Sequence, residues 1–391
     1  MLFFCNFVYL FHFQEFCFGG QFMDDLKNFF CWNKKCPKYG LRGTENIRVR
    51  TTYGTKNTRL LYCTHCLQTF SERRGTVFFR SSLSDETIVS IHEHVVEGNG
   101  MRKTGRLTKV HHQTVIRHTR LAGAHAEQLH DDLVAFSPED QGGSVRRKVG
   151  LRQKKGKNCD NNNPADTRCG DNWDHVALDA EHKLVLDVVN GKRTVKNTKQ
   201  LVENTACRLN YKPPRLITTD EYPPYKQAIL ESFGIKRTPK RTFIRGRPRK
   251  PSYHPSKDLV YATVHKTRVK GRVKRIDYRT VFGTGEQVEK ALKVSKCSRK
   301  INTSFIERHN GTDRNRCSRK VRKSYCFSKD WDVHRAATCL SMYSYNFCWA
   351  VRTLRRPDGQ KGKCTPAMAA GLTDHLWTMK EWLKMPVCKL E

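Results

Sequence analysis

The sequence predicts a multi-domain protein with an N-terminal zinc knot, a helical helix-turn-helix and a C-terminal α/β domain. Three observations support this fold class: two cysteine pairs before residue 70, apolar residues at helix spacing after residue 85, and strands alternating with helices after residue 170. A chain of 391 residues has room for two or three domains and at least one sizeable core.

The chain is strongly basic, with 73 Lys and Arg against 37 Asp and Glu and a net charge of +36. Such an excess favours a polyanionic partner, and we expect double-stranded DNA. A generic basic surface is the alternative. A role at a membrane surface fits less well, because the charge is spread along the chain and not set on one amphipathic helix.

Residues 1–22 are rich in Phe and Cys but contain no Lys or Arg, and Glu15 interrupts them. A secretion signal has a basic start and a small-residue cleavage site, and a membrane span needs about 20 apolar residues. We therefore expect 1–22 to be a disordered or spurious extension, with Met23 as the start. The expected location is the cytoplasm, at the nucleoid, where reduced cysteines can bind metal.

The domain expected at 23–80 contains two cysteine pairs, Cys31/Cys36 and Cys63/Cys66. The residues between the pairs include two alternating stretches, 47–53 and 58–63, typical of a β-hairpin. Two such knuckles can hold one tetrahedral, structural Zn²⁺, which substitutes for a core that this short segment cannot build. Unrelated buried cysteines are the alternative.

The domain expected at 81–132 has helical periodicity at 87–96, 101–107 and 111–121, separated by Gly98, Gly100 and a turn at 108–110. We expect a helix-turn-helix whose third helix lies in the DNA major groove. An ordinary three-helix packing unit is the alternative. The candidate DNA-binding residues are Arg102, Lys103, His112, Gln113, Thr114, Arg117 and Arg120.

The domain expected at 133–391 begins with a hairpin at 173–179 and 183–189, followed by a helix at 199–209. A buried strand then ends at Asp220, and Glu307 follows in the run Thr303-Ser-Phe-Ile-Glu. Acids at strand ends converge on a site in α/β folds. Carboxylates on a basic chain indicate metal-dependent chemistry on a phosphodiester.

Several long stretches between Cys31 and the C-terminus carry a family resemblance. They include the four-cysteine knot, Gly170-Asp-Asn-Trp-Asp-His-Val-Ala-Leu-Asp, Ile217-Thr-Thr-Asp-Glu-Tyr and Asn302-Thr-Ser-Phe-Ile-Glu-Arg-His-Asn-Gly. With these motifs the chain resembles insertion-sequence transposases of the IS-one type, which are DDE-class enzymes with a ribonuclease-H-like core.

The resemblance implies that Asp220 is the second catalytic Asp and Glu307 the catalytic Glu, both ligands of a two-Mg²⁺ site. In such a site three carboxylates hold the ions about 4 Å apart for cleavage and strand transfer at the element ends. It also implies binding to terminal inverted repeats and target DNA, and a homo-oligomer, because two element ends must be joined.

The first catalytic Asp of the family is missing. Its strand usually resembles Thr-Arg-Glu-Val-Gln-Phe-Asp-Glu-Lys-Trp, whereas this chain has Asp140-Gln-Gly-Gly-Ser-Val-Arg-Arg-Lys-Val, which does not alternate like a buried strand. One set of codons for 139–155, read one base out of frame, spells the family-like sequence. We therefore expect a compensated frameshift that puts Arg146 in the place of the Asp.

Two alternatives remain open from the sequence. Residues 139–155 can be a diverged loop, with Asp174 or Asp179 as the first acid. The protein can also be a non-catalytic DNA-binding protein that occupies element ends or inhibits transposition.

Finally, Arg245 and Arg247 lie in Arg245-Gly-Arg-Pro-Arg-Lys, which resembles a minor-groove AT-hook, with a basic linker as the alternative reading.

Overall fold

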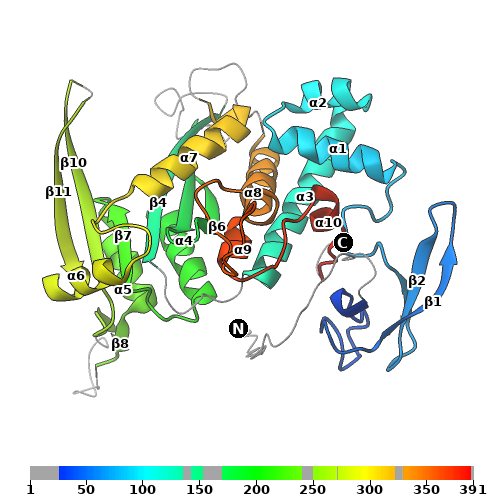
Figure 1. Cartoon of the computed structure of the whole chain (residues 1–391), viewed down its shortest axis with the longest axis horizontal. Coiled ribbons are helices and arrows are strands. Elements are labelled where there is room, and N and C mark those ends of the chain that lie inside the picture. Colours follow the sequence, from blue (N-terminus) through cyan, green and yellow to red (C-terminus); the bar gives the residue numbers. More distant parts are fainter. Residues whose placement is uncertain are drawn as a thin grey trace, which may run out of the picture. The chain divides into compact units, whose positions relative to one another are not determined.

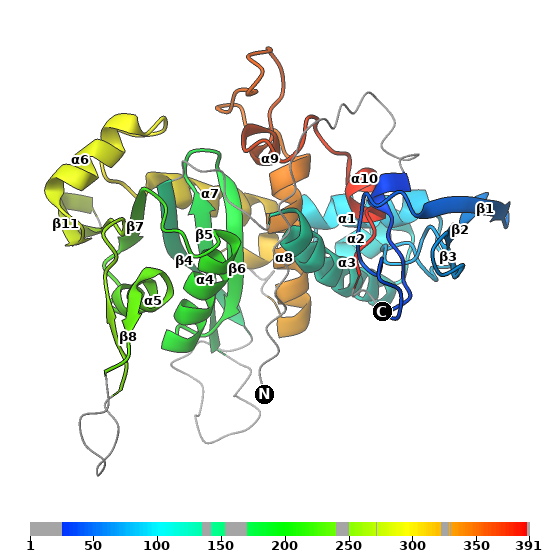
Figure 2. The same cartoon turned by 90° about the horizontal axis from the view of Figure 1, so that it is seen from below.

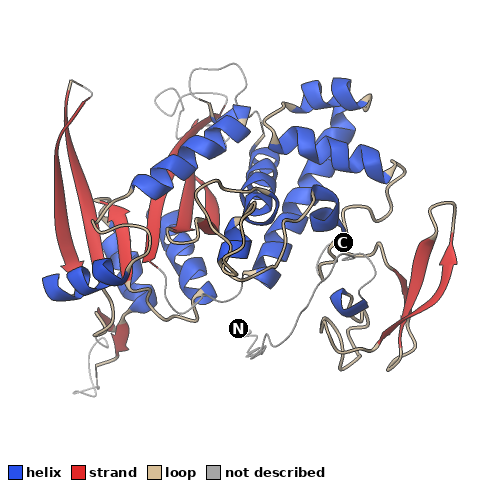
Figure 3. Cartoon of the chain, in the orientation of Figure 1, coloured by secondary structure: helices blue, strands red, loops and turns tan. Residues whose placement is uncertain are grey.

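The computed structural model describes residues 26–134, 142–152, 170–239, 250–270, 272–321, 328 and 330–388 (Figure 3). These residues form two compact units, divided after Phe70. The expected extension at 1–22, the start at Met23 and the candidate DNA contacts Arg245 and Arg247 lie outside the described residues.

The first unit is built on a β-hairpin. Strands β1 (Ile47–Tyr53) and β2 (Thr58–Cys63) pair antiparallel, and β3 (Thr69–Ser71) completes a three-stranded sheet. A short 3-10 helix, η1 (Leu26–Asn28), precedes them. The hairpin predicted from the alternating residues is confirmed. Its apolar core is small, consisting of Ile47, Leu61 and Phe70 around the cysteines.

The second unit begins with three helices: α1 (Asp85–Val96), α2 (Met101–Thr108) and α3 (His112–Leu133). The Ser84 side chain caps α1 by accepting a hydrogen bond from the Thr87 backbone N–H. The expected end of the third helix at residue 121 is wrong, because α3 continues to Leu133. In the second half of α3, His125 and His130 are buried. Because these buried residues are polar, the sequence there does not show the apolar periodicity of a helix.

Helix α3 packs against α8 (Trp331–Cys348), whose residues from Val333 to Phe347 are almost all buried. A Cβ atom on Gly123 would lie 2.4 Å from the Ala336 Cα, so the two helices cross at a point where only glycine fits. The three-helix segment is thereby joined to the rest of the second unit through one continuous helix.

The second unit contains a six-stranded sheet in the order β11-β10-β7-β4-β5-β6. Strands β4, β5 and β6 form an antiparallel meander, β7 is parallel to β4, and β10 is parallel to β7. The expected hairpin and the strand ending at Asp220 are confirmed. The strands are β4 (Gly142–Arg152), β5 (Gly170–Asp179), β6 (Leu184–Gly191), β7 (Leu216–Asp220), β10 (Tyr261–Val269) and β11 (Arg272–Phe282).

Strand β4 comes from the segment that does not alternate like a buried strand, yet it pairs with β7 on one side and β5 on the other. The diverged-loop alternative for this segment is therefore wrong for 142–152. Backbone hydrogen bonds, which every residue type except proline can donate, hold the strand at the centre of the sheet.

Helices lie on both faces of the sheet (Figures 1 and 2). Helix α7 crosses over β4, and Figure 2 shows it on the side of the sheet away from α4 and α5.

Helix α4 begins earlier than the expected residue 199, because the Thr194 side chain caps its N-terminus. The remaining elements are α4 (Val195–Arg208), α5 (Pro224–Phe233), β8 (Ile235–Arg237), β9 (Ser252–His254), α6 (Gly285–Val294), α7 (Ser304–Arg316), η4 (Ser318–Lys320), α9 (Pro366–Ala369) and α10 (Met379–Lys384). Among the described residues, none of these helices is long and apolar enough to span a bilayer.

Burial keeps three histidines of helices α1 and α3 neutral, namely His92, His118 and His130. Burial lowers the pKa of His92 to about 3, with the neighbouring His118 and His125 adding to the effect. Burial also lowers the pKa of His118, and it lowers that of His130 well below the usual range, where Arg208 contributes. His130 also stacks on Tyr343 with ring centroids 3.8 Å apart.

We predict that the protein loses stability as pH falls below about 6.5, the unfolded-state pKa of histidine. Below that pH the unfolded chain binds protons at these histidines and the folded chain does not, which costs up to about 1.4 kcal/mol per pH unit for each site. Urea unfolding between pH 7.5 and pH 5 measures the slope. His92→Leu should reduce it by about one proton, whereas exposed His254→Gln should not.

Candidate catalytic face and metal centre

The four predicted zinc ligands come together in the first unit. Their sulfur atoms all lie within 4.8 Å of one another, and the Cys31 and Cys66 sulfurs are 3.5 Å apart. A tetrahedral zinc with Zn–S bonds of about 2.3 Å requires sulfur separations of about 3.8 Å. Cys31, Cys36 and Cys63 are buried, Cys66 is half-buried, and all four cysteines are free thiols. The donor set therefore fits a metal such as zinc.

Hydrogen-bond donors surround these sulfurs. The Asn46 side chain donates to the Cys63 Sγ over 3.0 Å, and the Asn33 backbone N–H donates to the Cys31 Sγ over 3.4 Å. Burial raises the pKa of Cys66, but the Gln68 backbone N–H and the Cys31 thiol outweigh it and bring that pKa to about 7. Donors of this kind stabilise thiolate ligands.

In the second unit, Asp220 is the last residue of β7 and lies level with Val264 of β10. On its other side, Thr219 pairs with Val145 of β4, so Arg146 occupies the next register position, level with Asp220. Residues that lie level on adjacent strands are about 4.8 Å apart and face the same side of the sheet. The register thus puts the backbone of Arg146 next to that of Asp220.

Glu307 lies in the first turn of α7 and reaches the same face of the sheet. Its Oε1 accepts hydrogen bonds from the Lys266 Nζ over 2.5 Å and from the Thr303 hydroxyl over 3.0 Å. Lys266 is two residues beyond Val264 on β10, so it points to the same side as Asp220. Its ammonium group neutralises Glu307 in an ion pair that is only partly exposed.

A third metal ligand does not join these two acids. Among the described residues, no further His, Cys, Asp or Glu completes a cluster of metal-ligand atoms with Asp220 and Glu307. Arg146 pairs with Val176 of β5, so Val176 is the β5 residue level with the site. Asp174 is two residues away from Val176 and two strands from β7, which puts its Cα about 12 Å from that of Asp220.

Asp174 instead belongs to a buried ionic cluster. Its carboxylate lies 3.2 Å from the Lys320 Nζ and accepts a hydrogen bond from the Asn190 side chain over 2.5 Å. Lys320 also contacts Asp313 of α7 over 3.0 Å, and it is almost fully buried. The cluster ties α7 to β5 through a lysine held between two carboxylates.

The other alternative for the first acid, Asp179, lies at the turn between β5 and β6. Its carboxylate accepts hydrogen bonds from the Glu181 backbone over 2.9 Å and from the His182 ring over 2.6 Å. Asp179 therefore stabilises this turn, and it does not lie at the strand position level with Asp220.

On the opposite face of the strand ends, Glu221 is held by Arg279 over 2.6 Å and His265 over 2.5 Å. Tyr261 lies next to Thr219, with their hydroxyl oxygens 2.7 Å apart. Burial raises the pKa of Tyr261 to about 12, with Asp220 and Glu221 adding to the rise.

Lys266, Lys320 and Arg279 are functional candidates that the sequence did not predict, because only long-range pairing brings them to these acids.

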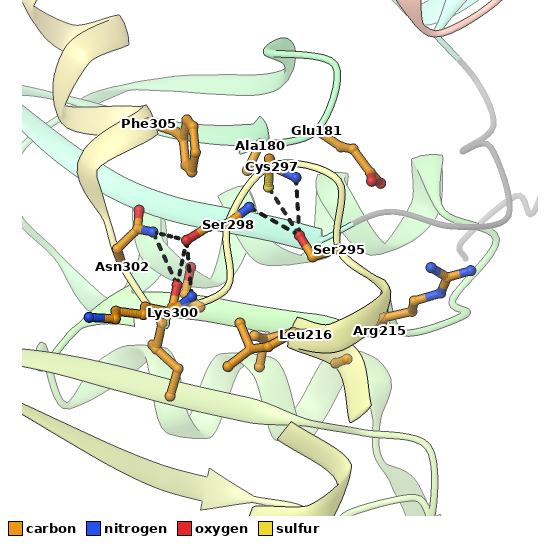
Figure 4. Close-up of a pocket in the computed structure, with 14 residues that line it drawn as sticks. Ala180, Glu181, Arg215, Leu216, Ser295, Cys297, Ser298, Lys300, Asn302 and Phe305 are labelled. Carbon is orange, nitrogen blue, oxygen red and sulfur yellow. Dashed lines mark hydrogen bonds between the residues drawn. The ribbon is translucent and has the colours of Figure 1, made fainter. Parts of the chain in front are cut away.

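A small cavity of about 50 Å³ lies at the other end of β7. Figure 4 shows Leu216, Cys297 and Phe305 around it, with Ser298 hydrogen-bonded to Asn302. It excludes Asp220 and Glu307, and it is far smaller than the roughly 300–1,000 Å³ of small-molecule sites. The candidate chemistry therefore lies on the open sheet face and not in this cavity.

In the helical segment, Arg102, Lys103, Gln113 and Arg117 are exposed, and Val115 is buried as expected. His112 and Thr114 are half-buried, as is Ile116, which was expected to point inward. The last candidate, Arg120, is exposed but forms an ion pair with Asp330 over 3.0 Å at the start of α8.

No family model matches the chain, and no curated protein matches it. Among solved structures it is similar to the Mos1 strand transfer complex and to the Mos1 transposase paired-end complex with left transposon end. Each alignment has 14% identity and a TM-score of 0.16, and covers 39% of this chain. The matched region spans 55% and 56% of those chains, little more than half their length. A likeness this slight assigns neither fold nor function.

We predict one zinc ion per chain. Cys36→Ser should remove most of the bound zinc, because three thiolates and a hydroxyl make a poor structural site. Cys207→Ser, which changes an exposed cysteine of α4, is the matched control and should keep the full zinc content. Elemental analysis of the purified variants measures this; unchanged zinc in Cys36→Ser would show that this cluster is not the site.

We predict that Lys320→Met destabilises the second unit by about 3–5 kcal/mol, because it leaves two buried carboxylates facing each other. Chemical denaturation measures the loss. Adding Asp174→Asn and Asp313→Asn to the same chain should recover much of it, and exposed Lys290→Met should have little effect. A stable Lys320→Met single variant would contradict the role given to the cluster.

Proposed function

We propose that this protein is a DNA-binding protein with the architecture of a DDE-class transposase of the IS-one type, whose catalytic face lacks its first metal ligand. The strand order supports the architecture. An antiparallel three-stranded meander, extended from its first strand by two parallel strands, is the arrangement expected of a ribonuclease-H-like core. Asp220 at the end of β7 and Glu307 in α7 are the two acids to which the resemblance assigns catalytic roles.

The single observation that carries the proposal is the register of β4, in which Val145 pairs with Thr219 of β7. Arg146 then follows at the strand position level with Asp220. A two-Mg²⁺ site needs three carboxylates, and the ions supply water activation and stabilisation of the leaving 3′ oxygen. Here the face offers Asp220 and Glu307, and Glu307 is already paired with Lys266. These residues do not fit a two-metal site, and we assign no cleavage step to the chain as it stands.

DNA binding remains as the proposed activity. The net charge of +36 and the exposed side chains of α2 and α3 support it. Arg102, Lys103, Gln113 and Arg117 would contact the phosphates and base edges of the terminal repeats, in the manner of a helix-turn-helix. Arg120 first has to leave Asp330. Double-stranded DNA, both element ends and target, is the proposed partner, and two copies would join two ends.

The function that follows is occupancy of element ends without cutting them, which would block an intact relative. This is the non-catalytic alternative considered from the sequence, and the ion pair of Glu307 with Lys266 favours it. The four cysteines of the first unit fit a structural zinc ion. Any part of the DNA binding that depends on the folded first unit should therefore be lost when a chelator removes the zinc.

We predict salt-sensitive DNA binding and no Mg²⁺-dependent nicking of supercoiled plasmid by the chain as given. Replacing 140–149 by Thr-Arg-Glu-Val-Gln-Phe-Asp-Glu-Lys-Trp restores an acid at position 146 and should produce nicking. Adding Asp220→Asn to that restored chain should abolish it again. Robust nicking by the chain as given would overturn the catalytic half of the proposal, and absence of DNA binding would overturn the other half.

A further inference from the structure

Strands β10 and β11 form a two-stranded ribbon that extends beyond the sheet. Strand β10 pairs with β7 only from Tyr261 to Val264, whereas its pairing with β11 continues to Val269 opposite Arg272. From His265 onward the ribbon has no third strand beside it among the described strands. Figure 1 shows the two strands rising past the end of β7.

This ribbon is strongly basic and exposed. Residues 265–279 contain seven Lys or Arg and a single Asp. From residue 267 onward, nearly every described side chain of the ribbon is exposed. The cations are Lys266, Arg268, Lys270, Arg272, Lys274, Arg275 and Arg279. A solvated edge hairpin does not need this many like charges, which repel one another across the strands.

The two faces of the ribbon differ. Val264 pairs with Tyr278 and Lys266 with Ile276, so these residues point to the side that carries Asp220 and Glu307. On that side Tyr278 is 48% exposed, and Ile276 and Val273 are each 43% exposed. The other side carries Arg275 and Arg279, which hold Asp277 and Glu221. An apolar strip flanked by cations therefore lies beside the catalytic face.

We propose that the β10–β11 ribbon is a second DNA-contacting arm, which lies along double-stranded DNA next to the two acids. The inference rests on the DNA binding proposed above and adds a contact surface separate from α2 and α3. Two-stranded ribbons fit DNA grooves, and Lys and Arg on both strands can reach the phosphates. The like charges disfavour a second copy's ribbon as the occupant, because two such ribbons would repel each other.

The location fits this role. Within the second unit, Figure 1 shows the ribbon at one end and α2 at the other, with α7 between them. DNA held by both would cross the face that carries Glu307. Since Lys266 of the ribbon itself bonds Glu307, the ribbon is already fixed in register with the acids.

The test compares two full-length variants with the same loss of charge. One is Arg268→Gln/Arg272→Gln/Arg275→Gln in the ribbon. The matched control is Arg352→Gln/Arg355→Gln/Lys361→Gln, which changes exposed cations of the loop after α8. Affinity for a short DNA duplex is measured over a range of salt concentrations.

The ribbon variant should bind about 10–100-fold more weakly near 0.1 M salt, and the slope of log K against log salt should be shallower by about 2–3. The control should change the slope by less than about one. Equal behaviour of the two variants would overturn the ribbon inference while leaving the proposed function intact. Absence of binding by the parent chain would remove the proposed function itself.

A second measurement needs no variant. Limited trypsin digestion of the parent chain should cut within 266–279, and saturating DNA should protect those sites more than sites in 352–363. Unchanged cleavage of the ribbon in the DNA-bound chain would contradict the inference. So would a ribbon variant that changes the oligomeric state but not the salt slope, because the ribbon would then contact another copy.

Discussion

Charge balance on one face of the six-stranded sheet is the constraint on which the rest depends. On the side that carries α7, cations of the protein itself hold the acids. Lys320 lies between Asp174 and Asp313, Lys266 holds Glu307, and Arg146 has the strand position level with Asp220. A carboxylate cluster that binds two divalent cations needs a surplus of negative charge. Here Lys266 and Lys320 offset part of that negative charge.

The same sheet connects the two surfaces proposed to contact DNA. Helix α3 runs from the exposed side chains of Gln113 and Arg117 to the close crossing of Gly123 with Ala336 of α8. The surface proposed to read DNA is therefore joined to the sheet by one continuous helix. At the other end of the unit, the β10–β11 ribbon extends directly from the strands that hold Asp220 and Lys266. Neither proposed contact surface includes the position of the first Asp, so the proposed DNA binding does not depend on that residue.

Much of this organisation could be predicted from sequence where the pattern is local. The cysteine pairs, the β1–β2 hairpin and the strand ending at Asp220 follow from spacing and alternation. The length of α3 could not, because His125 and His130 are buried by partners far along the chain, Met385 and Leu186. Strand β4 was also missed, since backbone pairing between β7 and β5 overrides its basic composition. Lys266 and Lys320 reach their acids through pairings that no local pattern reveals.

The most direct measurement is the binding of divalent ions to the acids of the second unit. It is made by calorimetric titration of the full chain with Mn²⁺ after the zinc site has been filled. The chain as given should show no saturable binding at millimolar Mn²⁺, and Arg146→Asp should create binding that Asp220→Asn removes. Saturable binding of two ions by the unaltered chain, lost in Asp220→Asn, would contradict the proposal that this face lacks a two-metal site.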